Sequence, residues 1–405
     1  MNPDVSTRLK SLPAVVDVLI LGAGGAGYPA AFFLARSGKS VLLVDPIGNL
    51  GGDCLAEGCV PSKAMREAAL VRALANKFGN FGLRGDKPAV DWRAVLAHKD
   101  RVQSTRYAQH REEIAQGGAL FVQGRGAIVA PNRARIDAAD GDTREVGFRH
   151  LILGTGSAEL TNFLHASLAQ RVRIELSAQV TAIERARDGY AVRYTQNGKQ
   201  HSVQGDAVLM ASGRVAVLPE GIDHLGVQME RGHVVVDGSL RSSNPQVWAP
   251  GDVNGRSMLF HSAVRQSLVV AHCIAAGGQA VDRMHFDAVP MTVFTEPELA
   301  HVGLTSARAE DALGAGEVAV TRYDYAQDSR AQIYGETQGF IKLVFSRKDA
   351  RLLGAQIAGM DAAQLIAPLA LALERNLDAR ALATTSFPHP MPSEGINKAA
   401  RAFQP

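Results

Sequence analysis

The first part of the chain alternates apolar runs with a glycine-rich turn in a way that predicts secondary structure. A mostly apolar run over 17–21 is followed by the sequence Gly-Ala-Gly-Gly-Ala-Gly over 22–27. Residues 28–40 then carry apolar side chains at helical spacing, and a second apolar run over 41–45 ends in an aspartate. Short runs that are apolar throughout are typical of strands in a buried parallel sheet. The pattern therefore predicts a strand, a tight turn, a helix and a second strand parallel to the first.

The turn in this βαβ unit has the spacing G-x-G-x-x-G, and an acidic residue closes the second strand about 20 residues later. Gly22 permits the tight turn, Gly24 lets the backbone approach a pyrophosphate, and Gly27 lets the helix pack on the strand. The helix N-terminus favours the phosphate charge. Asp45 would accept hydrogen bonds from an adenosine ribose. The unit predicts a bound dinucleotide but does not distinguish FAD from NAD.

A second, smaller region of mixed pattern follows in the middle of the chain. The elements predicted there are a helix over 161–170, strands over 172–176, 179–186 and 206–214, and a hairpin over 190–205. The hairpin turn is assigned to Asn197-Gly198, because this pair suits a two-residue turn with positive φ.

Composition restricts the class of protein. The chain of 405 residues is long enough for two or three domains, and 46% hydrophobic with 20% charged residues is ordinary for a globular protein. The net charge is +3, and this near balance gives no reason to expect nucleic acid or membrane partners. The N-terminal residues lack the apolar stretch of a signal peptide, so a cytoplasmic location is expected.

Two of the three cysteines, Cys54 and Cys59, lie five positions apart in the segment GGDCLAEGCVPSK. A zinc site is disfavoured because no second cysteine pair exists, and no metal is expected. A redox-active pair and a pair of small buried residues both remain open at this point. In a regular helix, positions five apart are too distant for a disulfide, so a disulfide here needs an interrupted helix. Three glycines and Pro61 allow such an interruption followed by a new helix.

The βαβ unit followed directly by this double-cysteine segment resembles the flavoprotein disulfide reductases, which include dihydrolipoamide dehydrogenase, glutathione reductase and mercuric reductase. The resemblance covers most of the chain. The matching segments are the double-cysteine segment 51–63, strand-like segments 124–131 and 151–158, a second flavin motif 247–253, interface-domain segments 294–305 and 336–345, and a C-terminal active-site segment 387–400. Within the family, the chain most resembles the dihydrolipoamide dehydrogenases.

The resemblance implies a role for each catalytic residue. Cys59 would lie against the flavin and pass electrons to it, and Cys54 would exchange with a substrate thiol. His389 would be the thiol base, oriented by Glu394. In the family this histidine reaches the flavin site of the other subunit, so a homodimer is implied. Lys63 would lie beside the flavin.

The resemblance also implies a bound FAD and a set of residues around it. These residues are Gly22, Gly24, Gly27, Asp45, Gly52, Gly126, Thr155, Gly156, Gly251, Asp252 and Ala263. The small-molecule partner would be a dithiol or disulfide, such as the lipoyl group of a partner protein.

The sequence departs from the family where a second G-x-G-x-x-G normally opens the NAD(P) domain. No glycine occurs between Ser157 and Gly189, and the span from Ser157 to Val172 is too short for a βαβ unit, which needs about 30 residues. The unit is either deleted from the protein or missing from this sequence. NAD(H) binding is therefore in doubt. The acidic partner that the family supplies to Lys63 normally comes from the same absent helix.

These observations predict an α/β protein in three parts. Residues 1–157 with 246–284 form a Rossmann-like FAD domain, 158–245 a truncated NAD(P)-binding-like domain, and 285–405 an α+β dimerisation domain. The predicted function is dithiol–disulfide oxidoreduction of the dihydrolipoyl dehydrogenase type, with electrons passing between a dithiol, the cysteine pair, FAD and NAD(H). One alternative keeps this relay but uses a quinone or oxygen as acceptor. Another is a flavin-binding redox sensor without turnover.

Overall fold

The computed structural model describes residues 7, 9–46, 48, 50–153, 178–186, 189–208 and 216–404. By their contacts, residues of the chain divide into two compact units. The first comprises Met1–Ala158 and Arg214–Val289, and the second comprises Glu159–Gly213 and Pro290–Pro405. The predicted helix over 161–170, the strand over 172–176 and most of the strand over 206–214 lie outside the described residues. The division into three domains stays a prediction.

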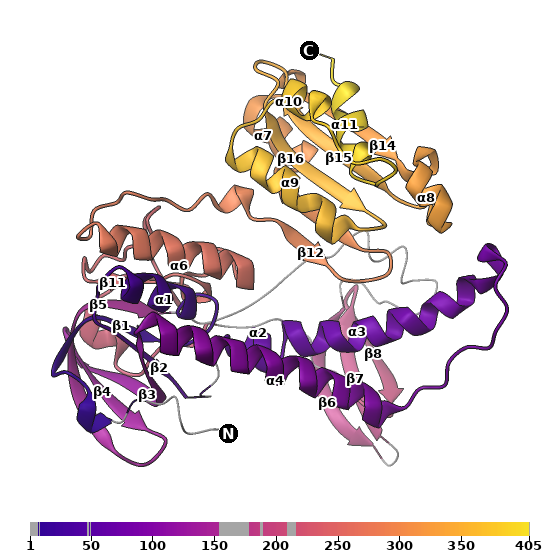
Figure 1. Cartoon of the computed structure of the whole chain (residues 1–405). Helices are drawn as coiled ribbons and strands as arrows, with labels where there is room; N and C mark the ends of the chain where they lie inside the picture. Colours follow the sequence, from indigo (N-terminus) through magenta and orange to yellow (C-terminus); the bar gives the residue numbers. More distant parts are fainter. Residues whose placement is uncertain are drawn as a thin grey trace. The chain divides into compact units, whose positions relative to one another are not determined.

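The first unit is built on a sheet whose central strands are parallel (Figure 1). Strand β1 lies between β2 and β5, and the outer neighbours are β3 on one side and β11 on the other. The strands are β1 (Val15–Leu21), β2 (Val41–Asp45), β3 (Leu120–Ala130), β5 (Thr143–Leu153) and β11 (Val247–Trp248). Strands β1 and β2 run parallel on either side of helix α1 (Tyr28–Arg36) in sequence, which confirms the predicted βαβ unit.

An antiparallel meander covers one face of this sheet. Strand β4 (Arg133–Ala138) pairs with the second half of β3 and the first half of β5, so both long strands belong to two layers. Alternating side chains of β1 and β2 point to this side and pack with the meander. The buried contacts include Leu19, Leu42, Ile136 and Phe148.

Three helices cover the other face. Ile20 and Leu43 of the sheet pack there against side chains of α1, α4 (Trp92–Gly117) and α6 (Phe260–Ala275), namely Leu34, Ile114 and Val269. Val18 and Ile20 alternate with Leu19 along β1, so the apolar run 17–21 serves both faces of the sheet. This burial on both faces explains why residues 18–21 are all apolar.

Two long helices form a hairpin that begins at the cysteine pair (Figure 1). The elements are α2 (Gly52–Ala56), α3 (Cys59–Leu74), the 3-10 helix η3 (Ala75–Phe81) and α4. The Asp91 carboxylate accepts hydrogen bonds from the backbone N–H groups of Arg93 and Ala94, which caps the start of α4. Gly118, with a φ of +77°, ends the same helix.

From Arg214 to Val289 the chain again belongs to the first unit. Leu225 and Val234 are buried in the core on the meander side of the sheet. This segment contains the short elements η4 (Ile222–Leu225), β9 (Met229–Glu230), β10 (His233–Val234) and η5 (Asp252–Asn254). Two further 3-10 helices of the first unit are η2 (Leu9–Ser11), near the N-terminus, and η6 (Phe286–Ala288), after α6.

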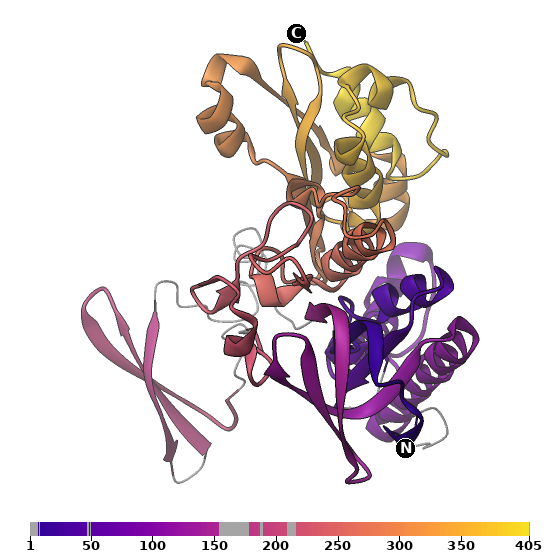
Figure 2. The same cartoon turned by 90° about the vertical axis from the view of Figure 1, so that its left-hand side faces the viewer.

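A separate sheet of three antiparallel strands lies in the middle of the chain (Figure 2). Its strands are β6 (Gln179–Ala186), β7 (Gly189–Gln196) and β8 (Lys199–Gly205). Asn197 and Gly198 have φ values of +50° and +74°, which confirms the predicted hairpin turn. Ile183, Val192 and Val203 lie opposite one another across the strands, and Ile183 and Val203 are 40% and 47% exposed. One face of this sheet therefore presents apolar side chains to solvent.

The C-terminal part contains a five-stranded antiparallel sheet in the order β12-β13-β16-β15-β14. Its strands are β12 (Met291–Val293), β13 (Leu299–Gly303), β14 (Val318–Asp324), β15 (Phe340–Ser346) and β16 (Leu352–Ala358). Its helices are α7 (Ser306–Leu313), α8 (Ser329–Tyr334), α9 (Ala362–Glu374), α10 (Ala379–Thr384) and α11 (Glu394–Arg401), with η7 (Ala315–Glu317) and η8 (Tyr325–Gln327). Side chains of α9 and α11, such as Leu369 and Ile396, pack with Phe345 in one core. Within the described residues, no helix combines the length and apolar character needed to cross a membrane.

Candidate active site

The glycine turn between β1 and α1 has the backbone that the sequence predicts. Gly22 has a φ of +101°, in the left-handed region that favours glycine. A Cβ atom on Gly27 would lie 1.9 Å from the Gly22 carbonyl oxygen, so only glycine allows α1 to begin this close to β1. Pro29 lies in the first turn of α1, where its missing N–H has no intrahelical partner to lose.

This contact predicts the effect of a single methyl group. Gly27→Ala is expected to lower the free energy of unfolding by about 1–3 kcal/mol, as overpacking does in a close-packed core, and to reduce the bound flavin. Gly79→Ala is the matched control, because a Cβ atom on Gly79 would have no neighbour within 4 Å. Denaturant unfolding and the ratio of flavin to protein absorbance measure both effects. Equal stability and flavin content in the two variants would contradict the packing role of Gly27.

Asp45, at the end of β2, is 5% exposed, and its carboxylate organises the glycine turn. The Ala23 N–H donates to its Oδ2 atom at 2.9 Å, and the Gly48 N–H donates to its Oδ1 atom at 3.2 Å. Hydrogen bonds to a carboxylate are stronger than neutral ones, so these contacts stabilise the turn. The ribose contact expected of Asp45 stays a prediction.

A second motif, Gly251-Asp252, lies far along the sequence and packs against the same turn. Gly251 has a φ of +85°, and a Cβ atom there would lie 2.8 Å from the Cβ of Ala26 and 3.6 Å from that of Ala263. Asp252 beside it is only 4% exposed. The structure thus brings together residues that the sequence places more than 200 positions apart.

These groups fit a flavin dinucleotide in chemical terms. A turn of glycine and alanine residues at a helix N-terminus suits a pyrophosphate, because backbone N–H groups and the helix dipole both favour negative charge. The Asp252 carboxylate can accept hydrogen bonds from sugar hydroxyl groups. Their convergence within the first unit supports the FAD site that the resemblance implies.

The double-cysteine segment packs directly on the glycine turn. The Gly51 N–H donates to the Ala23 carbonyl oxygen at 2.8 Å. A Cβ atom on Gly52 would lie 2.7 Å from the Cα of Gly24. Gly51 and Gly52 also have φ values of +113° and +57°, which favour glycine. The backbone therefore attaches the cysteine segment to the dinucleotide turn.

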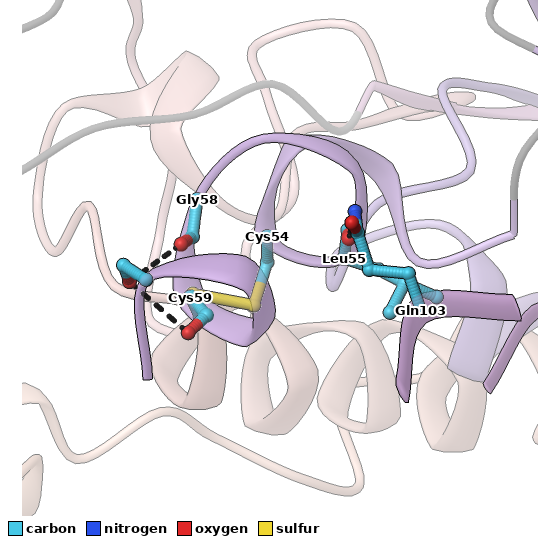
Figure 3. Close-up of a disulfide and its surroundings, with 6 residues drawn as sticks. Cys54, Leu55, Gly58, Cys59 and Gln103 are labelled. Carbon is cyan, nitrogen blue, oxygen red and sulfur yellow. Dashed lines mark hydrogen bonds between the residues drawn. A yellow bond between two sulfur atoms is a disulfide. The ribbon is translucent and has the colours of Figure 1, made fainter. Parts of the chain in front are cut away.

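Cys54 and Cys59 form a disulfide, with their Cα atoms 4.6 Å apart (Figure 3). Helix α2 ends at Ala56 and α3 begins at Cys59, so the helix is interrupted between the two cysteines. Ser62 Oγ donates to the Gly58 carbonyl at 2.6 Å, next to this interruption. The predicted pairing and the predicted interruption are both confirmed. Cys273 is a buried free cysteine on α6.

Lys63 lies one turn after Cys59 on α3, with much of its side chain exposed. Desolvation of its ammonium group lowers the pKa of Lys63, and the positive charge of Arg66 lowers it further. Both effects make the charged form less favourable than in free lysine. The role of Lys63 beside a flavin stays a prediction.

In the second unit, His389 and Glu394 meet as the sequence predicts. The His389 Nδ1 atom lies 2.9 Å from Glu394 Oε2, and Glu394 is the first residue of α11. The His389 side chain is 71% exposed and that of Glu394 is 20% exposed. A carboxylate on one ring nitrogen fixes the tautomer and leaves Nε2 to accept a proton. This geometry suits a general base, and the catalytic role itself stays a prediction.

Three of the residues proposed for FAD need separate mention. Gly126 lies in β3, where a Cβ atom would come within 2.4 Å of Leu21 Cδ2, so packing against β1 requires glycine there. Its contact with a cofactor stays a prediction. Thr155 and Gly156 lie outside the described residues.

The sequence analysis missed three buried polar residues that organise the site. Gln266 Oε1 accepts hydrogen bonds from the Gly251 N–H at 2.8 Å and from Asn254 Nδ2 at 2.7 Å. Gln103 and His110 of α4 contact the cysteine segment. A polar residue inside an otherwise apolar helical stretch could have indicated Gln266, but most residues of α4 are polar, so Gln103 and His110 do not stand out there.

Two family models match the chain. The model described as pyridine nucleotide-disulphide oxidoreductase matches residues 16–163 and 157–267, and the dimerisation domain of the same family matches residues 289–400. The first match comes in two pieces that meet at 157–163. This is the place where the sequence lacks the first half of a nucleotide-binding domain.

Several curated proteins with similar sequences are named dihydrolipoyl dehydrogenase. The dihydrolipoyl dehydrogenase of Geobacillus stearothermophilus is 30% identical, and the alignment covers 95% of each chain. That of Bacillus subtilis is 28% identical over 96% of each chain. The first alignment spans 456 positions, more than the 405 residues present, so the relative has segments without a counterpart here. A crystal structure of LpdA from Mycobacterium tuberculosis has the same fold, with a TM-score of 0.85 at 22% identity over 96% of this chain and 99% of that one.

Proposed function

The chain belongs to the pyridine nucleotide-disulphide oxidoreductases and is a flavin-dependent disulfide oxidoreductase, and from this premise we propose that its substrate is a dihydrolipoyl-type dithiol. The observation that supports this most directly is the position of the disulfide. The segment that carries Cys54 and Cys59 is hydrogen-bonded to the glycine turn through Gly51 and Ala23. A redox pair attached to a dinucleotide turn suits two-electron exchange between a thiol substrate and a flavin.

Each residue has a defined task in the proposed reaction. One substrate thiol, deprotonated by His389, attacks Cys54 and breaks the disulfide, which leaves Cys59 as a thiolate. The second substrate thiol then attacks the substrate sulfur bonded to Cys54, and its proton passes to the departing Cys54 sulfur. The substrate closes as a disulfide, and the cysteine pair has gained two electrons, as a Cys54 thiol and a Cys59 thiolate. Glu394 holds the His389 ring and stabilises its protonated form. Bound FAD supplies two-electron redox chemistry, and Gly22, Gly24, Gly251 and Asp252 would hold it.

The proposed assembly is a homodimer in the cytoplasm, in which His389 of each subunit serves the cysteine pair of the other. The matched dimerisation domain, residues 289–400, supports the dimer. The lipoyl group of a partner protein is the proposed source of the dithiol. The names of the curated relatives support this choice of substrate.

A thiol count tests the role of the cysteine pair. Treatment with dihydrolipoamide is expected to raise the number of alkylatable thiols by two, with Cys273 contributing none because it is buried. Cys54→Ser should abolish this increase, and Cys273→Ala is the control that should retain it. Mass spectrometry after alkylation measures the count. An unchanged count in the wild type would exclude the proposed exchange and favour a flavin-binding protein without turnover.

A second candidate keeps the dithiol and replaces NAD with another electron acceptor, such as a quinone or oxygen. The sequence favours it, because no G-x-G-x-x-G turn occurs between Ser157 and Asp206 to hold the pyrophosphate of a nicotinamide dinucleotide. Stopped-flow absorbance separates the two candidates. Bleaching of the flavin by NADH supports a nicotinamide dehydrogenase, and bleaching by dihydrolipoamide alone supports the second candidate.

A further inference from the structure

Helix α4 buries two polar side chains against the cysteine segment Leu50–Cys59, which we call the redox loop. Gln103 and His110 are 8% and 6% exposed, whereas most of α4 is accessible to solvent. They are seven residues apart, or about two helical turns, so they lie on one face of the helix. Buried polar groups in folded proteins are nearly always hydrogen-bonded. The partners of these two side chains therefore indicate what the face does.

Gln103 binds the end of α2 (Figure 3). Its Nε2 atom donates to the carbonyl oxygens of Leu55 at 2.9 Å and Ala56 at 2.7 Å. Helix α2 has only five residues and ends at Ala56, so its last carbonyls are of the kind that a helix terminus leaves without intrahelical donors. One carboxamide from 47 residues away thus caps two of them.

His110 holds the opposite end of the redox loop. Arg106 donates to His110 Nε2 at 2.8 Å, which makes this nitrogen the acceptor and leaves the proton on Nδ1. The Nδ1–H then donates to the Leu50 carbonyl oxygen at 2.8 Å. Helix α4 therefore fixes the redox loop before and after Cys54.

We propose that Gln103 is a positioning residue that holds Cys54 close to Cys59 and so sets the equilibrium between the disulfide and the dithiol. The inference rests on the proposed role of this pair in thiol exchange. After reduction no covalent bond joins the two sulfur atoms, and the interruption at Gly58 leaves α2 and α3 separate. The contacts from Gln103 then keep the two thiols at high effective concentration. Their loss favours the dithiol.

Gln103→Met tests this proposal, because methionine has a similar length but no donor. The full-length flavoprotein is equilibrated with glutathione buffers, in which two glutathione thiols reduce the Cys54–Cys59 disulfide and leave as one glutathione disulfide. Alkylation and mass spectrometry of the peptide that contains both cysteines give the equilibrium constant. We expect a shift of about tenfold toward the dithiol, as for the loss of one net hydrogen bond, which corresponds to about 30 mV.

Gln116→Met is the matched control. Gln116 lies on the exposed face of the same helix and bonds Glu112, so its replacement should leave the equilibrium constant at the wild-type value. Gln103→Asn provides a second, milder variant that keeps the amide but shortens its reach. We expect a smaller shift in the same direction, because the shorter side chain reaches at most one of the two carbonyls.

The outcomes separate this inference from the proposed function. Suppose that the wild-type pair exchanges and that both Gln103 variants keep the wild-type equilibrium constant. The positioning role would then be overturned, even if Gln103→Met lowers stability, while the proposed role of the cysteine pair would stand. If Gln103→Met yields no folded protein, the equilibrium constant of Gln103→Asn alone decides whether the positioning role stands. If the wild-type pair does not exchange with glutathione, mixtures of dihydrolipoamide and lipoamide replace the glutathione buffers in the same measurement. A wild-type pair that exchanges with neither would overturn both proposals.

Discussion

Replacing His389 with alanine is expected to slow dithiol oxidation by about 10²- to 10⁴-fold, the usual contribution of a general base. The imidazole is 2.9 Å from the Glu394 carboxylate and largely exposed, so it is oriented and accessible to a thiol. Flavin content should not change, because His389 lies outside the unit that contains the glycine turn. Stopped-flow reduction of the flavin by dihydrolipoamide measures the rate.

Glu394→Gln is the companion variant. It keeps the size of the side chain and removes the charge that stabilises protonated His389, so an intermediate loss of rate is expected. A wild-type rate in His389→Ala would contradict the base assignment.

A mixed dimer tests whether the base acts across subunits. Subunits with His389→Ala are combined with subunits with Cys54→Ser. If His389 serves the partner's cysteine pair, one site of the mixed dimer keeps both groups and the other loses both. About half of the wild-type activity supports the arrangement, and no activity contradicts it.

NADH is expected to bind the 405-residue chain with millimolar affinity or weaker. No strand–GxGxxG–helix sequence occurs between Ser157 and Asp206, and backbone N–H groups at such a helix normally hold the pyrophosphate. Each lost charge-assisted hydrogen bond costs about 1.5–3 kcal/mol, and each 1.4 kcal/mol is about tenfold in affinity. Two or three such bonds separate micromolar from millimolar binding.

Titration calorimetry with NADH, on protein whose intact mass equals that of this sequence, measures the affinity. Micromolar binding would show that the remaining residues form a nucleotide site.

The parts of the fold that follow from local pattern were predictable. Strand β1, the glycine turn and α1 are contiguous, so periodicity and glycine spacing identify them together. The interrupted helix at the cysteines follows from the distance limit of a disulfide, since five positions of regular helix exceed it. The contact between His389 and Glu394 is also local, within a single loop and the start of α11.

Contacts between distant segments were not predictable in this way. Gln103 and Leu55 are 48 residues apart, and a glutamine on a polar helix is usually exposed. Gly126 illustrates a different limit: the resemblance implies a cofactor contact, which stays a prediction, and its packing against the side chain of Leu21 became visible only in the structure. Burial of Leu225 and Val234 in the first unit likewise depends on the course of the chain after a long excursion.

The pairing of β5 with β11 has an evolutionary consequence. The chain leaves the first sheet at the end of β5 and returns at β11, where Val247 and Trp248 pair with Leu151 and Ile152. An excursion that begins and ends on adjacent strands can change length with little effect on its host, as inserted domains do. Leu225 and Val234 are buried in the core of the first unit, so the part of this excursion that can vary lies before residue 225. The segment between β5 and Leu225 can therefore change in length or content during evolution while the glycine turn and the cysteine pair of the first unit stay unchanged.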